Sequence, residues 1–183
     1  HPTLRRQRQM CIRDSNYSSI EAVFITHFHS DHIDGLGELS LFRWIGGQKR
    51  EPLNVYGPEG IDQVVNGFNV AYELDSRYRN LHHGDDVADL NGYGMIPITF
   101  DMDEKIANTI VFNDDGVKVE AFSVNHAPAS PAVGYKISYK GRSTVISGDT
   151  SKNKNLERNS KDVDLLIHSG LSPKLLKMMS SAA

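Results

Sequence analysis

The sequence predicts an α/β protein whose β component is predominantly antiparallel and rich in hairpins. Three observations support this fold class. The apolar run at residues 20–26 has the character of a buried strand, and a helical spacing of apolar residues follows it at 31–44. From residue 95 onward, short apolar runs alternate with turn residues. The sequence lacks the regular strand–helix alternation and the glycine-rich phosphate loop of a Rossmann fold.

The individual elements follow from the same patterns. Gly46-Gly47 ends the helix that begins at residue 31. Asp114-Asp115-Gly116 and Lys140-Gly141 supply hairpin turns. Residues 75–95, rich in Asp, Gly, Asn and His, predict a loop. The predicted strands are 20–26, 53–56, 96–100, 110–113, 117–124, 133–139, 143–147 and 164–168, and the predicted helices are 31–44, 61–74, 153–160 and one beginning at 173–179.

Length and composition indicate one domain of ordinary globular character, with 183 residues of which 39% are hydrophobic. No apolar run approaches the roughly 18 residues of a membrane span. Cys11 is the single cysteine, so an intrachain disulfide is excluded. This favours a cytoplasmic location, and a periplasmic protein without disulfides also fits. The net charge of −3 argues against a broad nucleic-acid surface.

The first fifteen residues differ from the rest of the chain. They hold four arginines and no clear strand or helix period, and no apolar core follows as in a targeting peptide. Residues 6–15 resemble a translated sequencing-adapter fragment, and a disordered basic tail is the alternative. We therefore predict a non-native or disordered segment at 1–15 and a folded domain at 16–183.

Four potential metal ligands directly follow the first predicted strand: His27, His29, Asp31 and His32. His27 and His29 are two residues apart, so in extended geometry they point to the same side. Asp31 and His32 lie at the turn into the helix and can face the same space from another direction. Imidazoles and carboxylates suit zinc and similar divalent metals, and four donors within six residues suggest two adjacent ions.

The string His27-x-His29-x-Asp31-His32 resembles the signature of the metallo-β-lactamase superfamily. Later segments resemble its other motifs in the same order, and the resemblance runs from about residue 20 to 168, most strongly to the ribonuclease Z-like and arylsulfatase-like branch. It implies the αββα sandwich of that fold. The matching later segments are Val124-Asn125-His126 followed by Gly134-Tyr135-Lys136, then Ser147-Gly148-Asp149-Thr150, then Asp164-Leu165-Leu166-Ile167-His168.

The resemblance also implies a site with two zinc ions, although manganese and iron stay open. A hydroxide held by the metals would be the nucleophile, and Asp31 would accept a proton during attack. The implied ligands are His27, His29 and His126 for the first ion, Asp31 and His32 for the second, and Asp149 for both.

Other polar residues are interpreted as lying outside the metal shell. We expect His82-His83 and Asp85-Asp86 to be solvated loop residues and Asp34 to cap the helix towards solvent. His168, at a strand end, is expected to support the site without binding metal.

Two departures from the family pattern lead us to expect a domain truncated at both ends. Little precedes residue 16 where the family has a β-hairpin region. After His168 the family has the last histidine ligand of the second metal and, in this branch, a catalytic histidine. The given sequence reaches Ala183 without either histidine. Ser169 also stands where ribonuclease Z-like sequences usually have an acidic residue.

The expected activity is hydrolysis of an ester-type bond: a phosphodiester, sulfate ester, lactone or similar. Only 22 residues separate His126 from Asp149, too few for the long arm of one ribonuclease Z class. Together with the acidic net charge, this spacing favours a small-molecule ester as the partner and disfavours nucleic acid. No membrane partner is expected, and a homodimer is left open. The alternatives are a non-catalytic metal-binding fragment and a tRNA 3′ processing endonuclease.

Overall fold

The computed structural model describes residues 17–102, 108–170, 172 and 177. The chain divides into two compact units, His1–Phe100 and Asp101–Ala183. The segment predicted at 1–15 lies outside the described residues, as does the helix predicted to begin at 173–179 except for Lys177. The expectation of one folded domain over 16–183 stays a prediction.

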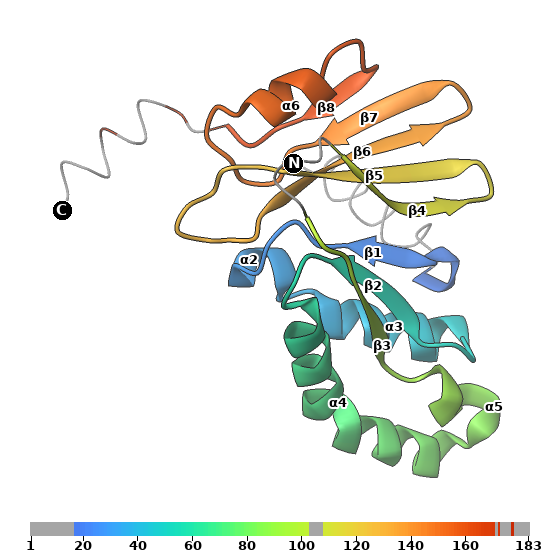
Figure 1. Ribbon diagram of the computed structural model, residues 1–183. Helices are drawn as coiled ribbons and strands as arrows, with labels where there is room; N and C mark the ends of the chain where they lie inside the picture. The colour runs from blue at the N-terminus through green and yellow to red at the C-terminus, as the bar shows by residue number, and fades with distance from the viewer. Residues whose placement is uncertain (1–16, 103–107, 171, 173–176, 178–183) are drawn as a thin grey trace, which may run out of the picture. The chain divides into compact units, whose positions relative to one another are not determined.

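The first unit is built on a three-stranded sheet in the order β1-β2-β3 (Figure 1). Both strand pairs are parallel, with Val23 opposite Val55 and Val55 opposite Pro97. The prediction of a predominantly antiparallel β component is wrong for this unit, because helical crossovers long enough for parallel pairing join its strands. Its elements are η1 (Tyr17–Ser19), β1 (Ala22–Phe24), α2 (Ser30–Ile33), α3 (Leu36–Gly47), β2 (Leu53–Gly57), α4 (Ile61–His83), α5 (Asp85–Ala88), η2 (Leu90–Gly92) and β3 (Met95–Thr99).

The core of this unit lies between one face of the sheet and the helices α3 and α4. Alternate residues of β2 are buried, as the period of a strand requires. Leu53 and Val55 of β2 pack in one cluster with Leu36 of α3 and with Ile61 and Val65 of α4. This packing fixes the sheet that carries residues 27–32, which we name the His-rich loop.

Two helix predictions differ from the structure. The helix predicted at 31–44 is divided into α2 and α3, with Asp34 and Gly35 between them, and α3 continues to Gly47 before Gln48 adopts a left-handed conformation. The helix predicted to end at residue 74 continues to His83, so most of the predicted loop at 75–95 is helical. Ion pairs at i,i+4 spacing support this extension on a strongly polar segment: Glu73 with Arg77 and Asp75 with Arg79.

The second unit contains a five-stranded sheet in the order β4-β5-β6-β7-β8. The first three pairs are antiparallel, as predicted, and β8 pairs with β7 in parallel. Both predicted hairpin turns are confirmed, since Asp115-Gly116 and Lys140-Gly141 have the two successive positive φ angles of a tight hairpin turn. Its elements are β4 (Thr109–Asp114), β5 (Val117–Ser123), β6 (Val133–Tyr139), β7 (Arg142–Ile146), α6 (Lys154–Asn159) and β8 (Leu165–Ile167).

Helix α6 covers one face of this second sheet. Its Leu156 packs with Phe122 of β5 and Val145 of β7.

Burial raises the pKa of the Tyr135 phenol in β6. In the part of the chain that the structure describes, no helix combines the length and apolarity needed to cross a membrane.

Arg43 of α3 is a buried cation that ties three segments of the first unit together. Its side chain is 3% exposed, and burial lowers its pKa, an effect opposed by Glu21 and Glu51. Its Nε donates to the carbonyl of Ile20 at 2.7 Å, and Nη1 donates to the carbonyl of Glu51 at 2.7 Å. The guanidinium therefore links the segment that precedes β1 to the segment that precedes β2.

We expect Arg43→Met to lower the free energy of unfolding by about 2–4 kcal/mol, because two carbonyls lose their donor inside the protein. Urea unfolding followed by circular dichroism measures this change. Arg50→Met is the control: the Arg50 side chain is 70% exposed and reaches Asp89 only at 3.8 Å, so its loss should cost less than about 0.5 kcal/mol. Equal costs for the two variants would contradict the structural role of Arg43.

Candidate metal centre

The His-rich loop leaves the carboxyl end of β1, at the edge where the parallel strands of the first unit end. The backbone N–H of Ile25 still donates to the carbonyl of Tyr56 at 2.9 Å, so the chain stays paired with β2 until just before the histidines. His27 follows two residues later and is 1% exposed. Carboxyl ends of parallel strands are a common place for ligand sites, because loops from several strands meet there.

Phe28 anchors this loop to the core of the first unit. It packs against the apolar cluster that contains Ile61 and Val65. Gly60, directly before α4, has a φ of 102°, and a Cβ at that position would lie 3.1 Å from the Phe28 ring. Gly60 thus allows both the left-handed turn and the close approach of Phe28, and the two histidines on either side of Phe28 are held in place.

The imidazoles of this loop face one another. The Nε2 atom of His27 lies 3.0 Å from Nδ1 of His29, and the ring centroids of His27 and His32 are 4.1 Å apart. Two nitrogens bound to one tetrahedral zinc ion at 2.0–2.1 Å are roughly 3.3 Å apart. The spacing of His27 and His29 therefore fits both a hydrogen bond and the edge of a metal site, and the donor set has the nitrogen and oxygen chemistry that zinc accepts.

Thr26 contacts the ring nitrogen of His27 that is directed away from His29. Its Oγ1 lies 3.1 Å from His27 Nδ1. An Nδ1–H that donates to this hydroxyl leaves the lone pair on Nε2, the atom that faces His29. The sequence interpretation did not single out Thr26, because a threonine at the end of a strand has no distinguishing pattern.

Asp31 and His32 lie at the start of α2, beside the other two histidines of the motif. The backbone N–H of His32 donates to the carbonyl of His29 at 3.0 Å, which closes the turn. The Asp31 carboxylate is 3.5 Å from His32 Nε2 and its side chain is 77% exposed. The four residues predicted from the first motif are therefore close neighbours, with His27 the most deeply buried of them.

In the second unit, the residues predicted as the remaining ligands lie on two loops that are joined to each other. His126 follows β5, and Asp149 follows β7. The N–H of Asn125 donates to Thr150 Oγ1 at 3.1 Å, and Thr150 Oγ1 donates back to the carbonyl of Asn125 at 3.1 Å. The N–H of Ser151 also donates to the Asn125 carbonyl at 3.0 Å. His126 and Asp149 are thus each adjacent in sequence to a residue of the same hydrogen-bonded junction.

His168 supports the loop that carries Asp149. Ser147 Oγ donates to the carbonyl of Gly148 at 2.6 Å and lies 2.8 Å from His168 Nδ1. A serine hydroxyl has one proton, so in this arrangement His168 Nδ1–H donates to it. At the other end of β8, the Ser143 N–H and the Arg142 guanidinium lower the pKa of the Asp164 carboxyl and hold β8 against β7.

A polar pocket adjoins His126 in the second unit. Asn153 and Asn155 contribute to it from the start of α6, and Asn155 Nδ2 donates to the carbonyl of Ser123 at 3.1 Å. Its lining consists of Ser123, Val124, Asn125, His126, Ala127, Ala129, Ser130, Asn153 and Asn155. The sequence interpretation did not identify these asparagines, because only the folded chain brings them to His126.

Five of the residues that the sequence placed outside the site belong to the first unit. His82 and His83 are exposed and end α4, far along that helix from its start beside Phe28 (Figure 1). They are helical, although they were predicted in a loop. Asp34 is exposed and caps the C-terminal end of α2. Asp85 and Asp86 form the first turn of α5.

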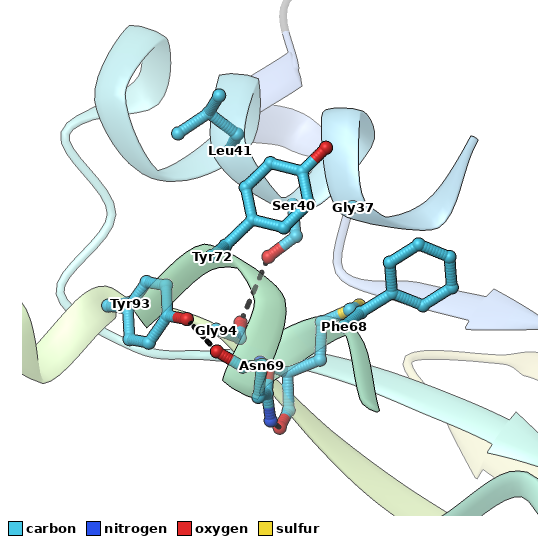
Figure 2. Close-up of a pocket in the computed structure, with 9 residues that line it drawn as sticks. Gly37, Ser40, Leu41, Phe68, Asn69, Tyr72, Tyr93 and Gly94 are labelled. Atoms are coloured by element: carbon cyan, nitrogen blue, oxygen red, sulfur yellow. Dashed lines mark hydrogen bonds between the residues drawn. The ribbon is translucent and has the colours of Figure 1, made fainter. Parts of the chain in front are cut away.

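A pocket of the first unit lies between α3 and α4 and has no metal-binding character (Figure 2). Ser40 Oγ donates to the carbonyl of Gly94 at 3.2 Å, and the Tyr93 hydroxyl donates to the carbonyl of Asn69. Burial raises the pKa of Tyr93. Since none of its lining residues is His, Cys, Asp or Glu, we assign this pocket to helix packing.

Comparison with known proteins shows to which family the chain belongs. Residues 1–180 match the family described as "Beta-lactamase superfamily domain". The chain belongs to this superfamily of metal-dependent hydrolases, in its ribonuclease Z-like branch, and the fold predicted from the motifs is confirmed.

Several relatives and solved structures resemble the chain. Ribonuclease Z of Mycolicibacterium gilvum is 29% identical over 164 residues, covering 88% of this chain and 54% of the relative. Ribonuclease Z of Mycobacterium marinum is 32% identical over 153 residues, covering 82% and 52%. The short form of human tRNase Z has a TM-score of 0.63 at 23% identity, covering 96% of this chain and 68% of that chain. YhfI from Bacillus subtilis, a metallo-β-lactamase fold protein, has a TM-score of 0.56 at 15% identity, covering 86% and 52%. The chain thus spans about half the length of the curated relatives it matches.

These relatives correct the predicted partner. The sequence interpretation favoured a small-molecule ester and disfavoured nucleic acid, and the match to ribonuclease Z proteins overturns that order. The interpretation was wrong because it relied on the net charge of −3 and on the 22 residues between His126 and Asp149. Neither quantity describes the charge of the surface beside the site.

We expect Thr26→Val to lower zinc affinity about 10-fold, because the hydroxyl that orients His27 is lost while the shape is kept. Competition with a chromophoric chelator measures the affinity. Thr26→Ser retains the hydroxyl and should bind zinc like the unaltered chain. If valine and serine behave alike, the orienting role of Thr26 is wrong.

Asp149→Ala should weaken zinc binding more than His168→Ala. Asp149 is proposed to bind metal directly, whereas His168 acts through Ser147, and loss of such a supporting group typically costs about 10–100-fold in affinity. Zinc stoichiometry by mass spectrometry and affinity by chelator competition test both variants. Equal stoichiometry and affinity would show that Asp149 is misassigned.

Proposed function

We propose that this protein is a zinc-dependent phosphodiesterase that processes the 3′ end of tRNA precursors. The observation that carries the proposal is the facing pair of imidazoles, His27 and His29, at the carboxyl edge of a parallel sheet. The ribonuclease Z names of relatives at 29% and 32% identity support the substrate class.

The proposed ligand set combines residues from both units. It retains the roles implied by the sequence motifs and requires that the two groups of donors serve one centre. His27, His29 and His126 would hold one zinc ion, Asp31 and His32 a second, and Asp149 both. The local geometry of each group supports the proposal: the imidazoles of the first group face one another, and one junction joins the two loops of the second.

Zinc in such a centre lowers the pKa of a bound water and polarises the phosphoryl oxygen. The residues of the chain then have separate tasks. The exposed Asp31 carboxylate would accept the proton of the water that attacks phosphorus, while the P–O bond to the leaving oxygen breaks and that oxygen takes a proton from solvent. Thr26 holds the His27 ring through its Nδ1 atom, and the polar pocket with Asn153 and Asn155 binds the part of the RNA next to the scissile phosphate.

The experiment measures zinc content and cleavage of a tRNA transcript with a 3′ extension, together with turnover of bis(p-nitrophenyl) phosphate. The zinc-loaded protein should cleave both substrates, and His27→Ala should lose zinc and reduce turnover by at least about 100-fold. His83→Ala is the matched control, since His83 is exposed at the end of α4 and should leave both readouts unchanged.

Two outcomes contradict the proposal in different ways. A folded protein that binds no zinc when zinc is supplied removes the metal centre. A protein that binds zinc but turns over neither substrate supports the alternative of a metal-binding protein without catalysis.

A further inference from the structure

Three basic residues form a stripe on the solvent side of α6, and they define what we name the α6 stripe: Lys154, Arg158 and Lys161. Lys154 and Arg158 are four residues apart on the helix. Lys161 follows its C-terminal end, where its N–H donates to the carbonyl of Arg158 at 3.4 Å and continues the turn. Residues at these spacings lie on one side of a helix.

The opposite side of α6 is attached to the sheet, so the stripe faces outward. Leu156 and Asn159 are the buried residues of the helix, and Leu156 packs with Phe122 of β5 and Val145 of β7. All three residues of the α6 stripe are exposed. Arg158 is also oriented, because its Nη2 donates to Asn155 Oδ1 at 2.8 Å.

We propose that the α6 stripe binds the phosphate backbone of the RNA substrate. The inference rests on the proposed function and identifies the surface that holds its substrate. At 1.5 Å per residue, Lys154 and Lys161 are separated by roughly 10 Å along the helix axis. The three side chains of the stripe can therefore each contact a phosphate along one RNA strand.

The position of α6 relative to His126 supports this assignment. Asn153 caps the helix, with its Oδ1 accepting from the N–H of Asn155 at 2.7 Å. Asn153 and Asn155 also line the polar pocket that contains His126. An RNA strand that passes from this pocket across the start of α6 therefore meets Lys154 first and Arg158 next.

The charges around the stripe leave it positive within an acidic chain. Glu157 is the acidic residue within α6, and it lies 3.4 Å from the Lys152 ammonium group. Asp162 follows the stripe and is exposed. Asp164 is engaged by Arg142 at 2.9 Å. Since the net charge of the whole chain is −3, this local excess of positive charge is the feature that an RNA backbone can recognise.

The test compares the zinc-loaded chain with the triple variant Lys154→Gln, Arg158→Gln and Lys161→Gln. Binding of the tRNA transcript is measured by fluorescence anisotropy at several salt concentrations. Loss of three phosphate contacts should make the negative slope of log K against log salt less steep by about 2. Binding at low salt should weaken roughly 10–100-fold. The KM for the transcript should rise, while turnover of bis(p-nitrophenyl) phosphate should stay unchanged, because a small diester does not reach the stripe.

Two further variants control for net charge and for folding. Lys118→Gln, Lys136→Gln and Lys140→Gln remove the same charge from β5, β6 and the turn that follows β6, and should leave the salt slope unchanged. Lys154→Arg, Arg158→Lys and Lys161→Arg retain the charge on α6 and should bind RNA like the unaltered protein.

The outcomes separate this inference from the proposed function. If the unaltered protein cleaves the transcript and the α6 variant has the same salt slope and KM, the inference is wrong and the proposed function stands. An equal loss in the β5–β6 control would also overturn it, because total charge would then explain the effect. Failure of the unaltered protein to turn over either substrate counts against the proposed function instead.

Discussion

The contact between His27 and His29 is the interaction on which the candidate site depends. Two imidazole nitrogens 3.0 Å apart cannot both carry a proton directed at the other, so this pair requires either one shared hydrogen bond or a cation. Thr26 orients the His27 ring by engaging its other nitrogen. The local backbone makes the contact rigid, since it follows a paired strand and is anchored through Phe28 to the core. The spacing of the two imidazoles, which would suit a metal ion, is thus a consequence of how the ends of this loop are held.

In the second unit, hydrogen bonds between two loops hold the candidate ligands in place. His126 and Asp149 belong to different loops, and each would move with its own loop if the loops were independent. The reciprocal bonds between Asn125 and Thr150 couple them. The contact between Ser147 and His168 adds a further constraint from the end of β8. A site whose donors come from loops needs this kind of support, because small displacements of a ligand weaken metal binding.

The sequence predicted the strands and the hairpin turns well, because these depend on local pattern. The turns at Asp115-Gly116 and Lys140-Gly141 require positive φ angles that few residues adopt. The residue types alone therefore predicted these turns. The length of α4 could not be predicted, because its second half is rich in Asp, Asn and His, which have low helix propensity. Ion pairs such as Glu73 with Arg77 stabilise the helix there. The parallel order of the first sheet depends on how crossovers pack, which no local window contains.

The error about the partner has a physical explanation of the same kind. Net charge is a sum over the whole chain, whereas an RNA strand experiences the field of the surface that it contacts, screened within about 10 Å at ordinary salt. A chain with a net charge of −3 can therefore carry a basic surface, provided that its acidic residues lie elsewhere or are paired. Glu157 beside Lys152 and Asp164 beside Arg142 are examples of such pairing near α6. Composition excludes a uniformly basic protein, but the distribution of charge over folded elements decides what the site can bind.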